Sequence, residues 1–171
     1  MFITVHASYG IFISQAVKSP ILVFLLSLFS HYLLDIIPHG DRDLSEWIGK
    51  KPVRLFKIEA IDLTILAVYL GILFWQGSEF NVLLLVISII GAALPDILSE
   101  IRHQSINSLA TFYRQFRLLD RIRLIKGFLN WQNRVHDKLH WLIKTNMGWV
   151  GGILIQVIFI LIFFFLATSI I

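Results

Sequence analysis

The chain contains no cysteine among its 171 residues. This absence excludes disulfide bonds and thiolate metal sites, so any metal ion would have to be held by imidazole and carboxylate groups. Charged residues are also scarce, at 15%, against 57% hydrophobic residues and a mean hydropathy of +0.76. An ordinary soluble domain has about 25% charged residues. The composition therefore indicates a membrane protein, and the length corresponds to one domain covering residues 1–171.

The hydrophobic runs predict an all-α, polytopic fold with about five transmembrane helices. The first run is short enough for a signal peptide, but it lacks a basic start and a clear cleavage site, so we expect a retained, buried helix. Gly10 and Ser14 in this run have a spacing that allows close approach to neighbouring helices. The predicted spans cover residues 2–17, 20–37, 60–75, 81–98 and 149–171.

Positive charge is concentrated in two predicted loops. Of the 15 Lys and Arg residues, 14 lie within residues 38–59 and 99–146, and Lys18 is the exception. Because loops rich in Lys and Arg stay in the cytoplasm, we expect a multi-pass inner-membrane protein with a cytoplasmic N-terminus and an external C-terminus. The net charge of +4 then indicates orientation first and affinity for anionic lipid headgroups second, and no nucleic acid partner is expected.

The second of these loops is predicted to form amphipathic helices over about residues 105–144. Arg114, Arg117 and Arg121 make a basic stripe beside a periodic apolar one, which is typical of a helix lying on an anionic leaflet. A second helix follows, with an apolar face made of Phe128, Trp131, Val135, Leu139 and Leu142. His136 and His140 flank that face, four residues apart, a spacing that can chelate one divalent ion. Two interfacial surface histidines are the alternative interpretation.

The densest run of ligand-type residues closes the span at residues 20–37. If the helix continues, His31, Asp35 and His39 fall within about 80° of one another, because residues four apart are offset by roughly 40°. Ionisable groups within a membrane are costly, so a chain that keeps them generally uses them. A buried structural hydrogen bond between His31 and Asp35 is the alternative, but it does not require His39 to extend the stripe.

Other ionisable residues are expected to reach the same cytoplasmic layer. His6 begins the first span, where it is either a ligand or a residue hydrogen-bonded to the backbone. Asp62 lies about one turn inside the third span, where an unpaired carboxylate would be costly. Asp96 follows Pro95 near the end of the fourth span and either caps a helical turn there or shares a helix face with the residues that follow. Asp41 lies just beyond the second span.

These residues resemble a known family. The His31-x-x-x-Asp35 pair in an apolar helix, the Pro95-Asp96 pair and the histidine near the N-terminus are similar to motifs of the small inner-membrane proteins classed as membrane-bound metal-dependent hydrolases. In that family a second aspartate usually follows the Pro-Asp motif two positions on, where this chain has Leu98. The resemblance implies a metal site and hydrolysis, without a defined substrate.

The sequence thus predicts a divalent metal site at the cytoplasmic membrane face. Zinc suits imidazole with carboxylate, and manganese and iron are alternatives. Asp41 or Asp62 would act as general base in a metal-dependent hydrolase acting on a phosphoester or lipid-like substrate. A metal or proton transporter and a non-catalytic scaffold are the competing interpretations. The predicted metal ligands are His6, His31, Asp35, His39, Asp96, His136 and His140.

Overall fold

The protein is helical throughout the residues that the computed structural model describes, which are 1–49, 52–106, 123–140, 142–143 and 147–169. No strand occurs within these ranges. The helices are α1 (Ile3–Ala16), α2 (Pro20–Asp35), α3 (Asp41–Ile48), α4 (Pro52–Trp75), α5 (Val82–Ile106), α7 (Arg123–His140) and α8 (Gly148–Thr168). The all-α prediction is therefore confirmed for this part of the chain. The predicted helix around Arg114, Arg117 and Arg121 lies outside the described residues.

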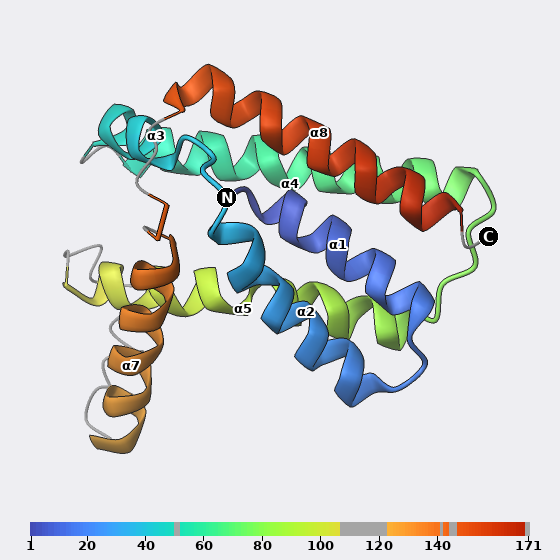
Figure 1. Ribbon diagram of the computed structural model, residues 1–171, viewed down its shortest axis with the longest axis horizontal. Helices are drawn as coiled ribbons and strands as arrows, with labels where there is room; N and C mark the ends of the chain where they lie inside the picture. Colours follow the sequence, from blue (N-terminus) through green and yellow to red (C-terminus); the bar gives the residue numbers. More distant parts are fainter. Residues whose placement is uncertain (50–51, 107–122, 141, 144–146, 170–171) are drawn as a thin grey trace.

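The helices α1, α2, α4, α5 and α8 run along one common direction (Figure 1). The chain passes along α1, α4 and α8 one way and returns along α2 and α5, while α7 crosses one end of this bundle at a steep angle (Figure 1). The N-terminus and the segment between α2 and α4 lie at that same end, and the described end of the chain lies at the other (Figure 1). Ligand-type residues from distant segments can therefore meet at one end of the bundle.

Three of the described helices are long and apolar enough to cross a membrane, over Val53–Trp75, Val82–Ser99 and Gly148–Thr168. α2 is apolar but has only 16 residues, and α1 has 14. A straight span needs about 17–25 residues, so length alone does not assign α1 or α2 as spans. The protein is a membrane protein, and the count of five spans stays a prediction.

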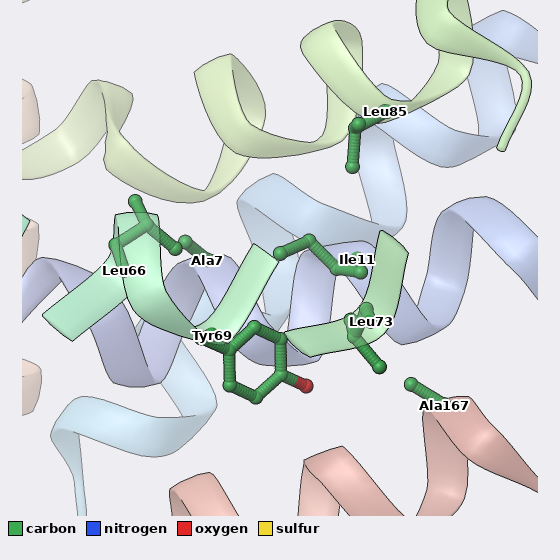
Figure 2. Close-up of a cluster of buried hydrophobic side chains, with 7 residues drawn as sticks. All are labelled: Ala7, Ile11, Leu66, Tyr69, Leu73, Leu85 and Ala167. Carbon is green, nitrogen blue, oxygen red and sulfur yellow. The ribbon is translucent and has the colours of Figure 1, made fainter. Parts of the chain in front are cut away.

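α1 lies at the centre of the bundle, where it contacts α2, α4, α5 and α8. A short helix that is covered on all sides gains its stability from packing rather than from helix propensity. Its apolar residues Ala7 and Ile11 pack against α4, α5 and α8 (Figure 2). The cluster of buried side chains consists of Ala7, Ile11, Leu66, Tyr69, Leu73, Leu85 and Ala167.

Glycines let the backbones of α1, α2 and α5 approach closely. Gly10 and Ser14 are both buried, and a Cβ added to Gly10 would lie 3.0 Å from the carbonyl oxygen of Ser88 on α5. A Cβ added to Gly91 on α5 would lie 2.8 Å from the carbonyl oxygen of Phe24 on α2. Small residues at these crossings are what permits close packing of membrane helices.

Several helix bounds differ from those predicted. α2 ends at Asp35 rather than continuing to residue 37. Pro38 follows, and a proline disfavours helical backbone in the residue before it. α4 begins at Pro52, eight residues before the predicted start at residue 60, because a proline is favourable in the first turn and the helix extends past its apolar part. α5 continues through Pro95 to Ile106, so the residues after Asp96 remain helical.

A candidate metal centre

Two histidines and two aspartates converge where α2, α5 and α7 meet. His31 and Asp35 come from the last turns of α2, Asp96 from α5 and His136 from α7. Each of these residues offers one ligand atom, and the four atoms all lie within 4.8 Å of one another. This group is called the metal centre below. It unites three helices, two of which are separated in the sequence by more than half of the chain.

Nitrogen and oxygen atoms alternate around the metal centre. Asp35 Oδ2 lies 3.0 Å from His31 Nε2 and 3.2 Å from His136 Nε2. Asp96 Oδ1 lies 3.5 Å and 3.4 Å from the same two nitrogens. In a tetrahedral zinc site with bonds of about 2.0–2.2 Å, neighbouring ligand atoms are about 3.3–3.6 Å apart. The two separations to Asp96 Oδ1 fall in this range, and the two to Asp35 Oδ2 are shorter than it by about 0.1–0.3 Å.

Two residues of the metal centre, His31 and Asp35, are buried, so water does not supply the hydrogen bonds that their side chains lack. The side chain of His31 is 0% exposed and that of Asp35 is 1% exposed. His31 Nε2 and Asp35 Oδ2 lie only 3.0 Å apart, but they do not form a hydrogen bond of suitable geometry with each other. Buried polar atoms without such a bond are costly, and in native proteins they are frequently satisfied by an ion. Both atoms are placed as ligands of a common ion would be.

The backbone of α5 orients the imidazole of His31. Its Nδ1 lies 2.6 Å from the carbonyl oxygen of Ala92, and a carbonyl can only accept a hydrogen bond. We therefore assign the proton to Nδ1, which leaves the lone pair of Nε2 directed into the metal centre. Metal-ligating histidines are usually held by this kind of hydrogen bond from the other ring nitrogen.

His136 reaches the metal centre because polar residues dock α7 against α5. Gln132 Nε2 donates to the carbonyl oxygen of Pro95 at 3.2 Å, and it lies one turn before His136 on the same face of α7. Ser99 Oγ donates to Asn133 Oδ1 at 3.3 Å and lies 3.4 Å from His136 Nδ1. The Ser99 hydroxyl thus remains available as an acceptor for an Nδ1 proton, and Nε2 faces the metal centre. Gln132 was not foreseen from the sequence, although its i, i+4 relation to His136 was a usable signal.

Electrostatics at His136 favour a positive charge. Burial disfavours the imidazolium, but the carboxylates of Asp35 and Asp96 outweigh this effect and raise the pKa of His136 to about 9. In the metal-free protein at neutral pH, a proton on Nε2 therefore faces the two carboxylates. A divalent cation has the same attraction to this position, because the two carboxylates balance its charge at low dielectric.

The predicted ligand His6 lies beside the metal centre but faces the other oxygen of Asp35. His6 Nε2 is 3.2 Å from Asp35 Oδ1, and the amino group of Met1 lies 3.4 Å from the same oxygen. The His6 ring stacks on that of His31 with a centroid separation of 3.9 Å and an interplanar angle of 24°. His6 is thus brought to the site, although it does not belong to the group of four.

The predicted ligand His39 is not brought into the metal centre. It lies beyond the end of α2, where its Nδ1 is 2.5 Å from the carbonyl oxygen of Ile37. Its own carbonyl oxygen accepts a hydrogen bond of 3.2 Å from Gln156 Nε2 on α8. The stripe of His31, Asp35 and His39 would require an uninterrupted helix, and α2 stops at Asp35.

The two predicted general bases have different outcomes. The carboxylate of Asp62 accepts hydrogen bonds from the backbone N–H of Thr4, with N–O distances of 3.3 and 3.4 Å, so it caps the first turn of α1. Asp62 is buried but is not part of the metal centre. Asp41 begins α3 and His140 ends α7, and the side chains of both lie outside those that the structure describes.

The buried face of α7 differs from its predicted apolar face and contains Leu129 beside Gln132 and His136. Gln132 and His136 are 2% and 8% exposed, whereas Phe128 and Trp131 are 53% and 56% exposed. The predicted apolar stripe therefore includes residues that point away from the bundle. Polar contacts and the buried Leu129 side chain hold α7 to the protein, and the apolar surface around Phe128 and Trp131 remains exposed.

Comparison with known proteins identifies no relative. No protein-family model, no curated protein and no solved structure matches the chain. Inferences about function therefore depend on the geometry of the residues themselves.

Proposed function

We propose that the metal centre is the catalytic site of a membrane-bound, divalent metal-dependent hydrolase that acts on a phosphoester or another lipid-like substrate. One observation carries this proposal: four buried or half-buried ligand atoms from three helices lie within 4.8 Å of one another, in the arrangement of a coordination shell. The family resemblance of the His31-x-x-x-Asp35 and Pro95-Asp96 pairs implies the same class of reaction.

The nitrogen and oxygen ligand atoms of the metal centre favour some metal ions over others. Two imidazoles and two carboxylates, without sulfur, suit zinc, with manganese and iron as alternatives. Two carboxylates also neutralise one divalent ion, which lowers the cost of holding that ion at membrane depth. When bound, such an ion lowers the pKa of a coordinated water and polarises a phosphoryl or acyl oxygen.

The residues of the metal centre differ in their access to solvent. The side chains of His31 and Asp35 are almost completely covered, whereas that of Asp96 is 26% exposed and that of His136 is 10% exposed. A substrate would therefore enter beside Asp96, along the edge of α7. His31 and Asp35 would hold the ion from the closed side, with Ala92 fixing the orientation of the His31 ring.

The position of α7 supports a substrate at headgroup depth. This helix crosses the end of the bundle that contains the N-terminus (Figure 1). Its exposed residues Phe128 and Trp131 give it an apolar surface that can face lipid. Trp is favoured at the boundary between headgroups and acyl chains. We infer that α7 lies in the plane of the membrane and that lipid headgroups pass close to the metal centre.

The orientation that we propose places this end of the bundle in the cytoplasm. Residues 38–59 and 99–146 carry 14 of the 15 Lys and Arg residues, and the described ends of both segments lie at this end. With α1 and α2 as the two shorter spans, the alternating helix directions correspond to five passes and a cytoplasmic N-terminus. The excess of positive charge would also attract anionic headgroups at the inner membrane.

Transport is less favoured than hydrolysis by the position of the ligands. Transport sites generally lie near the bilayer midplane at broken helices. Here Asp35 is the last residue of α2, and Asp96 lies three residues before the end of the apolar span at Ser99. Buried serines further along the bundle, such as Ser14 and Ser88, donate to carbonyl oxygens of their own helices. The hydroxyl groups of these serines therefore have hydrogen-bond partners within their own helices, and they do not mark a path for ions.

The proposal is tested by metal content and turnover. Protein purified in detergent and equilibrated with zinc should retain the metal, and His31→Ala should lose most of it. His39→Ala is the matched control, because His39 is also buried in this region but lies outside the metal centre, and it should keep its metal.

The zinc-loaded protein should then hydrolyse members of a panel of phosphodiesters, phosphomonoesters and phospholipids, and His31→Ala should not. Equal zinc retention in both variants would exclude the metal centre. Zinc binding that depends on His31, without hydrolysis of any compound in the panel, would instead show a structural metal in a scaffold.

A further inference from the structure

His6 presents a problem that a single metal ion at the metal centre does not solve. Its side chain is 0% exposed, its Nε2 faces Asp35 Oδ1 at 3.2 Å without ideal hydrogen-bond geometry, and its Nδ1 has no hydrogen-bond partner among the described residues. A buried polar atom left without a partner costs about 1–3 kcal/mol. Residue 6 lies in the most enclosed helix of the bundle, so an apolar side chain would be stabilised there without that cost.

The direction of the His6 ring indicates what is missing. Its Nε2 lies 3.2 Å from Asp35 Oδ1, while His31 and His136 face Asp35 Oδ2. The stacked rings of His6 and His31 are separated by 3.9 Å between centroids and are inclined by only 24°. The imidazoles of His6 and His31 are therefore nearly parallel, and each faces a different oxygen of the Asp35 carboxylate.

We propose that Asp35 bridges two divalent metal ions, with the second ion held by Asp35 Oδ1 and His6 Nε2. This inference rests on the proposed metal-dependent function and extends it to a two-metal site. A carboxylate that bridges two ions in hydrolytic enzymes holds them about 3.5–4 Å apart. The 3.2 Å separation of His6 Nε2 and Asp35 Oδ1 is close to the spacing of two ligands on one ion, as are the separations around Oδ2 for the first ion.

The second ion would replace a weaker cationic contact. The amino group of Met1 lies 3.4 Å from Asp35 Oδ1, which is beyond the usual length of a charge-assisted hydrogen bond. A divalent ion at about 2.0–2.2 Å from the same oxygen has the stronger attraction to it.

The charge of two metal ions also limits which substrates would bind. Two divalent cations carry four positive charges, and Asp35 and Asp96 supply two negative ones, so two positive charges remain to be balanced. The carboxylate of Asp62 is engaged with the first turn of α1 at Thr4. A phosphate ester supplies the required negative charge, whereas a neutral carboxylic ester does not. The two-metal site therefore selects anionic phosphate esters within the proposed range of substrates.

The experiment counts ions and tests whether they are adjacent. After equilibration with zinc, the parent protein should contain about two ions per chain, and His6→Gln should contain one. His39→Gln is the matched control and should retain two. Thermal unfolding of each variant checks that the fold is kept.

The manganese-loaded parent protein provides a measurement that needs no variant. Two ions joined by one carboxylate should give an electron paramagnetic resonance spectrum of a spin-coupled pair. A spectrum of isolated ions, or one zinc ion per chain in both the parent and His6→Gln, would refute the second site and leave the single-metal proposal intact. Two ions in both proteins would place the second ion away from His6 and would also refute it. A parent protein without bound metal would refute both proposals.

Discussion

Replacing Gly91 by alanine should show how tightly α2 and α5 must pack for the metal centre to form. A Cβ at this position would lie 2.8 Å from the carbonyl oxygen of Phe24 and 3.3 Å from Ser27 Cβ. Backbone stands in the way, so the two helices must separate by several tenths of an ångström. Gly71 on α4 is the matched control, because a Cβ there would meet nothing within 4 Å.

The expected difference in stability follows from two opposing effects. Both glycines lie inside helices, so alanine gains about 1 kcal/mol of helix propensity at either position. Overpacking at Gly91 costs about 1–3 kcal/mol, and no such cost arises at Gly71. The two variants should therefore differ by about 1–3 kcal/mol in the free energy of unfolding. For a chain of this size this corresponds to a separation of about 2–12 °C in Tm, with Gly71→Ala the more stable.

The same displacement should weaken metal binding. Ala92, next to Gly91, accepts the hydrogen bond of His31, so a shift of α2 relative to α5 moves His31 and Asp35 away from Asp96. Loss of such an outer contact typically costs about 10–100-fold in metal affinity. Thermal unfolding in detergent and competition titration with a zinc chelator measure the two effects. If Gly91→Ala matches Gly71→Ala in both Tm and zinc affinity, the helix contact does not control the metal centre.

Two further predictions concern orientation and pH. Because the chain has no cysteine, single cysteines at Glu79 and Asp137 report the two ends of the bundle: in intact cells an impermeant maleimide should label Glu79→Cys and should reach Asp137→Cys only after permeabilisation. The opposite pattern would reverse the orientation. The pKa of His136 is raised from 6.5 to about 9, so its ionic stabilisation of the metal-free protein is complete below about pH 6.5 and is lost as pH rises through about 9. Zinc must displace this proton, so its apparent affinity should rise about tenfold per pH unit from pH 6 to 8, and this slope should decrease in His136→Gln. An identical slope in the variant would show that His136 does not exchange its proton for the metal.

The sequence determined the class of protein and one pair of candidate ligands. Hydropathy alone identifies a membrane protein, because apolar helices of this length are stable only when lipid or protein covers them. His31 and Asp35 could be paired from the sequence because residues four apart in one helix necessarily face the same side. Their positions on one helix face depend only on local geometry, whereas their 3.0 Å separation also depends on the hydrogen bond from His31 to Ala92 on α5.

Tertiary structure decided which other residues join that pair. His39 continues the same spacing, yet the turn that includes Pro38 and Gly40, with φ of 78° at Gly40, ends the helix and takes His39 towards α8. His136 lies far along the chain and reaches the metal centre only because α7 docks onto α5, through Gln132 and through Asn133. Helix periodicity describes a face but does not say what the face will contact, since that depends on how separate helices pack.

The sequence also did not predict which partner each buried carboxylate has. Asp62 and Asp96 both read as ionisable residues near the ends of spans, but Asp62 caps α1 through Thr4 whereas Asp96 enters the metal centre. An aspartate near a helix N-terminus is stabilised by free N–H groups, and one beside imidazoles is stabilised by a shared cation or proton. Which of these partners is within reach is decided only when α1 has packed against α4, and α2 and α7 against α5, because the partners lie on different helices.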